Sequence, residues 1–184
     1  MRFKWLAKTM MALLKPLMLG IAKEEESKSA DCNTPLLLRH PWLINAYMQA
    51  RFLYVTDREL FGVVDRPQTA VEMLQREKGD CEDWAEVARA LLAPVYEPCL
   101  FYVSVRDKGE AKAHMVCVFS EGAKYSYIHT AGCRRKIVLK RANALIPAEI
   151  DLASRIAADV YPGALMAGYG RAVWNGERWQ PVGA

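Results

Sequence analysis

The sequence predicts an α+β fold, because helical patterns occupy the first half of the chain and short strands follow in the second half. Apolar residues recur at spacings of three and four through residues 41–55 and 84–92, which favours amphipathic helices. Beyond residue 98 the period changes, and segments rich in β-forming residues alternate with short turns. At 184 residues the chain is long enough for one sizeable core but short for two domains.

Three helices are expected before the strands. The first starts at Pro41, a residue suited to the first turn of a helix. The second starts at Thr69, where Thr69 and Glu72 fit a capping box. The third follows at once, with Asp80 at the N-cap and Asp83 at the third helical position.

The third helix carries an apolar stripe that is typical of a central, buried helix. The stripe consists of Trp84, Val87, Ala88, Leu91 and Leu92. Pro94 ends the pattern, since proline cannot continue a helix.

Three predicted strands span residues 99–106, 114–119 and 125–129, and turns at Gly109 and Gly122 separate them. Short strands joined by tight turns predict an antiparallel meander. The chain then returns to a helix over 146–160 and ends in a hairpin over 173–179, whose Asn-Gly pair is typical of a tight turn.

Composition excludes several classes of protein. The chain is 52% hydrophobic and 25% charged, which is ordinary for a globular protein and excludes intrinsic disorder. Five scattered cysteines without a CxxC pair, and only three histidines, exclude a disulfide scaffold and a zinc finger. We expect no metal and no cofactor.

The basic charge is uneven along the chain. Residues 1–23 carry five basic side chains and no acidic one, so the remainder is close to neutral. A second basic cluster, at 134–141, has no interleaved aromatic residues. Nucleic-acid binding is therefore not expected, and a solvated strand or turn face is the preferred interpretation.

Residues 1–33 predict an amphipathic N-terminal arm followed by a polar linker, and residues 34–184 a single folded domain. Apolar residues recur at helical spacing in the first 23 residues, with lysines between them, so this arm could lie on a membrane surface or dock on a protein partner. The alternative is a signal peptide. Lys15 and Pro16 interrupt the apolar run, which favours the arm and a cytoplasmic or particle-associated location over secretion.

Cys81 is the strongest candidate for chemistry. A cysteine in the first turn of a helix lies at the positive end of the helix dipole, which favours the thiolate. The three carboxylates of Asp80, Glu82 and Asp83 act in the opposite direction and raise the thiol pKa. A base must therefore activate the sulfur, and His114, at the start of a strand, is the natural candidate.

These residues resemble the transglutaminase-like cysteine peptidases, which have a papain-like fold. The resemblance rests on Gly79-Asp80-Cys81-Glu82-Asp83-Trp84-Ala85, on the strand that begins at Ala113-His114, and on the strand that ends at His129. It covers roughly residues 40–132. It implies a cysteine-bearing helix packed on an antiparallel sheet.

The resemblance also implies roles for single residues. The nucleophile of the family falls on Cys81 and its base on His114. The third member, normally Asp or Asn near the end of the next strand, falls on His129 or Thr130, and neither is the expected residue type. Gln75, six residues before Cys81, lies where papain-like enzymes carry an oxyanion-stabilising glutamine; a solvated helical glutamine is the alternative.

The leading hypothesis is a cysteine-dependent peptidase or amidase, with a peptide or amide substrate and transamidation as a possible outcome. The alternative is a catalytically inactive module of the same fold with a structural or accessory role in a larger assembly, such as a bacteriophage particle. The departure at the third position and the N-terminal arm motivate this alternative.

Overall fold

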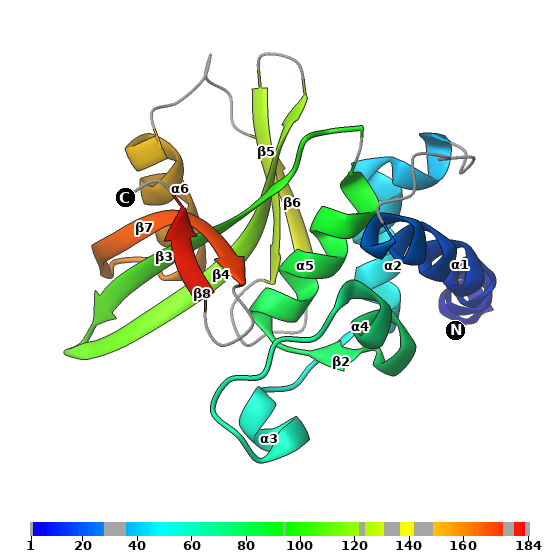
Figure 1. The fold of residues 1–184 in the computed structure, drawn as a ribbon, viewed down its shortest axis with the longest axis horizontal. Helices are drawn as coiled ribbons and strands as arrows, with labels where there is room; N and C mark the ends of the chain where they lie inside the picture. The colour runs from blue at the N-terminus through cyan, green and yellow to red at the C-terminus, as the bar shows by residue number, and fades with distance from the viewer. Residues whose placement is uncertain are drawn as a thin grey trace.

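The computed structural model describes residues 2–27, 36–93, 95–121, 124–130, 137–141, 149–174 and 179–182. Its helices are α1 (Arg2–Glu26), the 3-10 turn η1 (Leu36–Arg39), α2 (Pro41–Arg51), α3 (Asp57–Phe61), α4 (Ala70–Arg76), α5 (Cys81–Leu92) and α6 (Glu149–Val160). Its strands are β1 (Leu53–Tyr54), β2 (Lys78–Gly79), β3 (Cys99–Asp107), β4 (Glu110–Glu121), β5 (Lys124–Thr130), β6 (Ile137–Arg141), β7 (Leu165–Trp174) and β8 (Trp179–Val182). The α+β fold class is confirmed (Figure 1).

Some predicted features lie outside the described residues. These are most of the polar linker, Pro94, the turn at Gly122, Arg134–Lys136 of the basic cluster, the Asn175-Gly176 turn and the first three residues of the 146–160 helix.

The larger sheet has six strands within the described ranges, in the order β6-β5-β4-β3-β7-β8. Every neighbouring pair is antiparallel, so the meander of β3, β4 and β5 and the pairing of the terminal hairpin are confirmed. The short strands β1 and β2 pair in parallel beside α4 and α5.

The strand before the hairpin begins earlier than the sequence predicts, because β7 extends back to Leu165 along β3. Gly168 and Gly170 weaken its strand pattern. A Cβ atom at Gly170 would lie 3.2 Å from Cε1 of Tyr102. The glycine therefore makes room for this ring.

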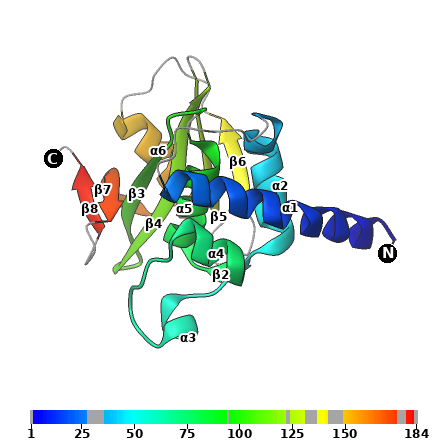
Figure 2. The same ribbon diagram turned by 45° about the vertical axis from the view of Figure 1, so that its right-hand side comes forward.

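Helices cover the two faces of the sheet differently. On one face α5 packs against β4 and β5 and α2 packs against β6, and α1 and α4 pack against α5 (Figures 1 and 2). On the other face α6 packs against β3 and β7. Trp84 of α5, 1% exposed, anchors the larger core, and Ile156 of α6 lies in the smaller one.

The second half of helix α1, within the segment predicted as an amphipathic arm, packs against the rest of the chain. Met18, Ile21 and Ala22 are fully buried in the same core cluster as α5. Lys15, which interrupts the apolar run, donates to the carbonyl of Gln75 at 3.0 Å and pairs with Glu77 at 3.1 Å. The apolar face of this half of α1 is therefore covered by its own chain.

The first turns of α1 extend past the other elements (Figure 2). Among the residues that the structure describes, no helix combines the length and hydropathy that a membrane span requires.

The helix starts follow the local sequence. The capping box of Thr69 and Glu72 at α4 is confirmed, and so is Asp80 as the N-cap of α5. The segment after residue 55, predicted as a connector, contains the short helix α3, which has its own capping box of Thr56 and Glu59. We missed it because α3 has only five residues and no apolar period.

Candidate active site

Cys81 occupies the first helical position of α5. Just before it, the backbone N–H of Asp80 donates to Asp83 at 3.2 Å, and Trp84 donates its indole N–H to the carbonyl of Gly79 at 3.0 Å. A Cβ atom at Gly79 would lie 2.8 Å from both Cβ of Asp83 and Sδ of Met73. Glycine is therefore required at this position for the turn to close against α5 and α4.

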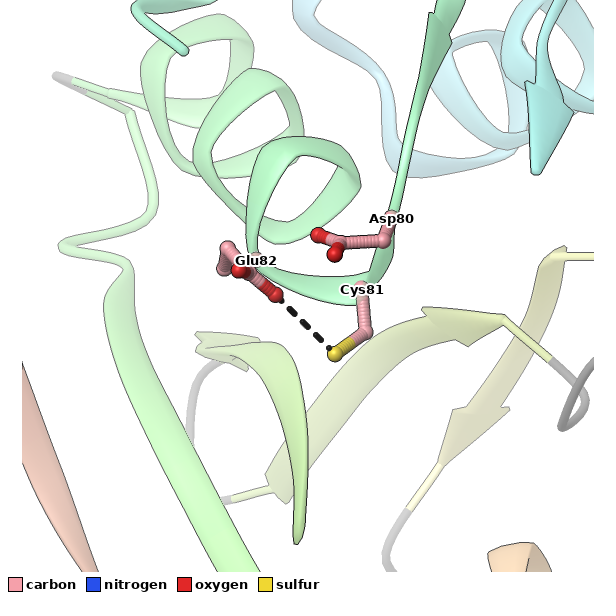
Figure 3. A group of neighbouring side chains, drawn as sticks. All are labelled: Asp80, Cys81 and Glu82. Carbon is pink, nitrogen blue, oxygen red and sulfur yellow. Dashed lines mark hydrogen bonds between the residues drawn. The ribbon is translucent and has the colours of Figure 1, made fainter. Parts of the chain in front are cut away.

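The thiol of Cys81 is hydrogen-bonded to an acid. Its Sγ lies 3.2 Å from Oε2 of Glu82 (Figure 3). Burial raises the thiol pKa well above its ordinary value, and the charges of Glu82 and Asp80 raise it further. A hydrogen bond from the backbone of Met115 on β4 lowers it. As the sequence predicts, the helix end alone leaves the thiol protonated.

The neighbouring acids are themselves hard to ionise. Burial, followed by Glu82, raises the pKa of Asp80 to about 9. Burial also raises the pKa of Asp83 to about 7, although the backbone and side-chain N–H groups of Gln68 both donate to it at 2.7 Å. Several carboxyl groups thus share one poorly solvated region at the start of α5.

Three overlapping groups of side chains in this region could hold a cation, because their ligand atoms lie within 4.8 Å of one another. They are Asp80-Cys81-Glu82, Asp57-Asp80-Asp83 and Asp57-Asp65-Glu82. Asp57 is 1% exposed, and its Oδ1 and that of Asp80 have no hydrogen-bond partner among the described residues. Carboxylate oxygens suit hard divalent cations such as Ca²⁺.

His114 lies on β4, directly opposite Val103 of β3. Side chains alternate along a strand: its neighbour Met115 packs into the core around α5, whereas Val103 packs against α6. The imidazole accordingly packs near His129 and Tyr161, with ring centroids 6.0 Å and 6.4 Å away. Burial, followed by His129, lowers the pKa of His114 to about 3.

The structure places both candidates for the third position near His114. Oγ1 of Thr130 lies 3.3 Å from Nε2 of His114. His129 is buried, with Nδ1 2.7 Å from the carbonyl oxygen of Thr130 and Nε2 2.8 Å from Oδ2 of Asp159. Thr130 is thus the candidate in direct contact with the imidazole.

A cavity of about 420 Å³ brings the main candidates together. Its lining residues are Asp65, Cys81, Glu82, Tyr102, Ala113, His114, Met115, Ala172, Trp179 and Gln180. Cys81 approaches from α5 and His114 from β4. Gln75 lies on the exposed side of α4 and is not part of this lining, so the structure does not bring it to the cavity.

Two residues of this region, Asp57 and Asp159, were not identified from the sequence. Asp57 follows the Thr56 capping box, which could have indicated a second acid-bearing helix start. Asp159 lies in an amphipathic helix far along the chain, and no local signal distinguishes it from a solvated acid.

Comparison with known proteins finds neither a matching family model nor a matching curated protein. Among solved structures, Legionella pneumophila LapG is similar with 19% identity and a TM-score of 0.43, over 88% of this chain and 86% of that one. Calcium-bound LapG from the same organism is similar with 21% identity and a TM-score of 0.39, over 67% of this chain and 81% of that one.

Proposed function

We propose that this protein is a cysteine-dependent hydrolase of amide bonds, with Cys81 as nucleophile and His114 as base. The observation that supports it is that a helix-start thiol and a strand imidazole line the same cavity. The hydrogen bond between Cys81 and the backbone of Met115, the residue after His114, ties α5 to β4 at this point.

In the proposed reaction the proton of Cys81 moves to Nδ1 of His114, and the sulfur bonds to the amide carbon. The backbone N–H groups at the start of α5 face the developing oxyanion. The carbon–nitrogen bond then breaks, and the leaving amine takes the proton from His114. Water hydrolyses the thioester and frees the thiol, and an amine in place of water would give transamidation.

Thr130 orients the base in this scheme. When Nε2 of His114 carries a proton, it can donate to Oγ1 of Thr130 across the observed 3.3 Å. Nδ1 is then left with a lone pair for the thiol proton. Thr130 thereby takes the orienting role that Asp or Asn has in related triads.

A hard divalent cation would resolve the conflict between the thiol and its acidic neighbours. In the described conformation Glu82 accepts the hydrogen bond of Cys81 and raises the thiol pKa. A cation on the oxygens of Asp57, Asp65 and Glu82 would neutralise their charge and draw Glu82 away from the sulfur. We include Ca²⁺ binding in the proposed function because Asp57 Oδ1 is buried and unpartnered among the described residues.

Alkylation of Cys81 by iodoacetamide, followed by peptide mass spectrometry across pH, tests the proposal. With Ca²⁺ we expect a midpoint below about 8.5, the value of a free cysteine. With a chelator we expect a midpoint above that value. Cys99, a partly buried thiol whose pKa burial raises, is the internal control and should label alike in both conditions.

The inactive-module alternative predicts a different result. Cys81 would then label like Cys99 with or without the cation, which would contradict the hydrolase. A low midpoint that does not respond to Ca²⁺ would retain the hydrolase and remove the cation from it. The comparisons give no support to a phage particle as the setting of this protein.

A further inference from the structure

A carboxylate–imidazole pair lies on the sheet face opposite α5, next to His114. Nε2 of His129 lies 2.8 Å from Oδ2 of Asp159, and the two side chains are 1% and 26% exposed. His129 belongs to β5 and Asp159 to α6, so the contact joins this helix to the sheet. The reaction scheme above uses neither side chain.

His129 also restrains Thr130. Its Nδ1 lies 2.7 Å from the carbonyl oxygen of Thr130. Because a carbonyl oxygen only accepts, Nδ1 carries the proton and donates. The carboxylate of Asp159 lies 2.8 Å from the other nitrogen, so the ring has a partner at each end that restrains its orientation.

Thr130 passes this restraint to His114. Its Oγ1 lies 3.3 Å from Nε2 of His114, and the rings of His114 and His129 are nearly perpendicular at 88°. A continuous series of contacts therefore runs from α6 through the end of β5 to the proposed base on β4.

We propose that Asp159 is a positioning residue that acts through His129 and Thr130 to hold His114 with Nδ1 free for the thiol proton. This inference rests on the proposed function and extends it, because it assigns the carboxylate that the end of β5 lacks to a residue outside the 40–132 region. The charge of His129 contributes to the low pKa of His114, and the carboxylate of Asp159 lies beside that charge.

The competing explanation is that Asp159 only fastens α6 to the sheet. Asp159→Asn tests this, with Asp151→Asn, the same change at an exposed position of the same helix, as matched control. Two readouts are needed: the ¹⁵N signals of the His114 imidazole, which report its tautomer, and the rate of Cys81 alkylation by iodoacetamide at neutral pH with Ca²⁺.

We expect Asp159→Asn to shift the His114 signals away from the pure Nε2–H tautomer and to slow alkylation by about tenfold, the lower end of the effect when a metal-bound histidine loses an outer-shell partner. Asp159→Glu, which keeps the carboxylate, should recover most of both effects, and Asp151→Asn should change neither.

Unchanged His114 signals and an unchanged alkylation rate in folded Asp159→Asn would overturn the inference and leave the hydrolase intact. Loss of thermal stability with unchanged signals and rate would also overturn it, because that result assigns Asp159 a fastening role alone. A wild-type Cys81 that labels like Cys99 would instead contradict the proposed function, and the tautomer shift would still decide the role of Asp159.

Discussion

The two faces of the sheet contribute opposite kinds of groups to one cavity. The α5 face supplies the thiol of Cys81 and a crowd of carboxyl groups, and further helices cover α5 from behind. The α6 face supplies the imidazole of His114 to the cavity, and His129 and Asp159 lie behind that imidazole, outside the lining. The thiol and its acidic neighbours thus lie on one side of β4 and the imidazole of His114 on the other, because successive side chains of a strand point to opposite faces.

This division explains why the Cys81 thiol is protonated in the described conformation. The hydrogen bond of Cys81 goes to Glu82 on its own face, and that of His114 goes to Thr130. Activation therefore requires a change at the acidic cluster, which a cation would supply, and a fixed tautomer at the imidazole, which the α6 face would supply.

Ile21 offers the most direct test of how much the packing of α1 contributes to stability. Ile21 belongs to α1 and is fully buried in the core cluster that it shares with α5. Ile21→Ala should therefore lower the free energy of unfolding by about 2–5 kcal/mol. Leu13→Ala, on the same helix but 71% exposed, should change it by about 0.5 kcal/mol or less. Urea denaturation of both variants makes the comparison. Equal small effects would show that α1 is a detachable arm.

The turn before Cys81 has no space for a side chain. In Gly79→Ala the new methyl group would meet Asp83 and Met73, so we expect about 1–3 kcal/mol of destabilisation from overpacking. Gly20→Ala is the control, because nothing lies within 4 Å of a Cβ there and alanine favours a helix by about 0.5–1 kcal/mol. In thermal denaturation we expect Gly79→Ala to be less stable than wild type and Gly20→Ala to be more stable. An unchanged stability of Gly79→Ala would contradict the close packing at this turn.

The α6 face should make the fold sensitive to acid. The pKa of His114 is about 3 in the folded protein and about 6.5 when unfolded. Below pH about 6.5 the unfolded state binds the extra proton, so stability falls by up to about 1.4 kcal/mol per pH unit as the pH drops towards 3. His114→Gln should remove this part of the slope. Denaturant titrations of both proteins at several pH values measure this slope. Equal slopes of unfolding free energy against pH in wild type and His114→Gln would contradict the burial of a neutral His114.

Most of the scaffold could be predicted because its signals are local. The capping box at Thr69, the N-cap at Asp80 and the period change near Cys99 each depend on neighbouring residues. The coverage of α5 by α1 and the pairing of β7 with β3 are contacts between distant segments. The glycines of β7 and the interruption of the apolar run of α1 by Lys15 weaken the local signals for these two contacts.

The candidate site divides in the same way. Cys81 is recognisable from the helix start and its acidic flanks, and His114 from its place at a strand. Asp159 comes to His129 only when α6 folds across the sheet, so no spacing in the sequence indicates it. That Met115, and not His114, faces α5 depends on the register of β4 with β3.

The central claim is that Cys81 and His114 work as a pair although they approach the cavity from different faces of β4. The most direct measurement is the alkylation rate of Cys81 at neutral pH with Ca²⁺ in wild type and in His114→Gln, with Cys99 as the internal standard. The account predicts that the substitution slows alkylation of Cys81 by about a hundredfold or more, since a positioned base contributes about 10²–10⁴-fold, and leaves Cys99 unchanged. Equal rates at Cys81 in the two proteins would contradict it.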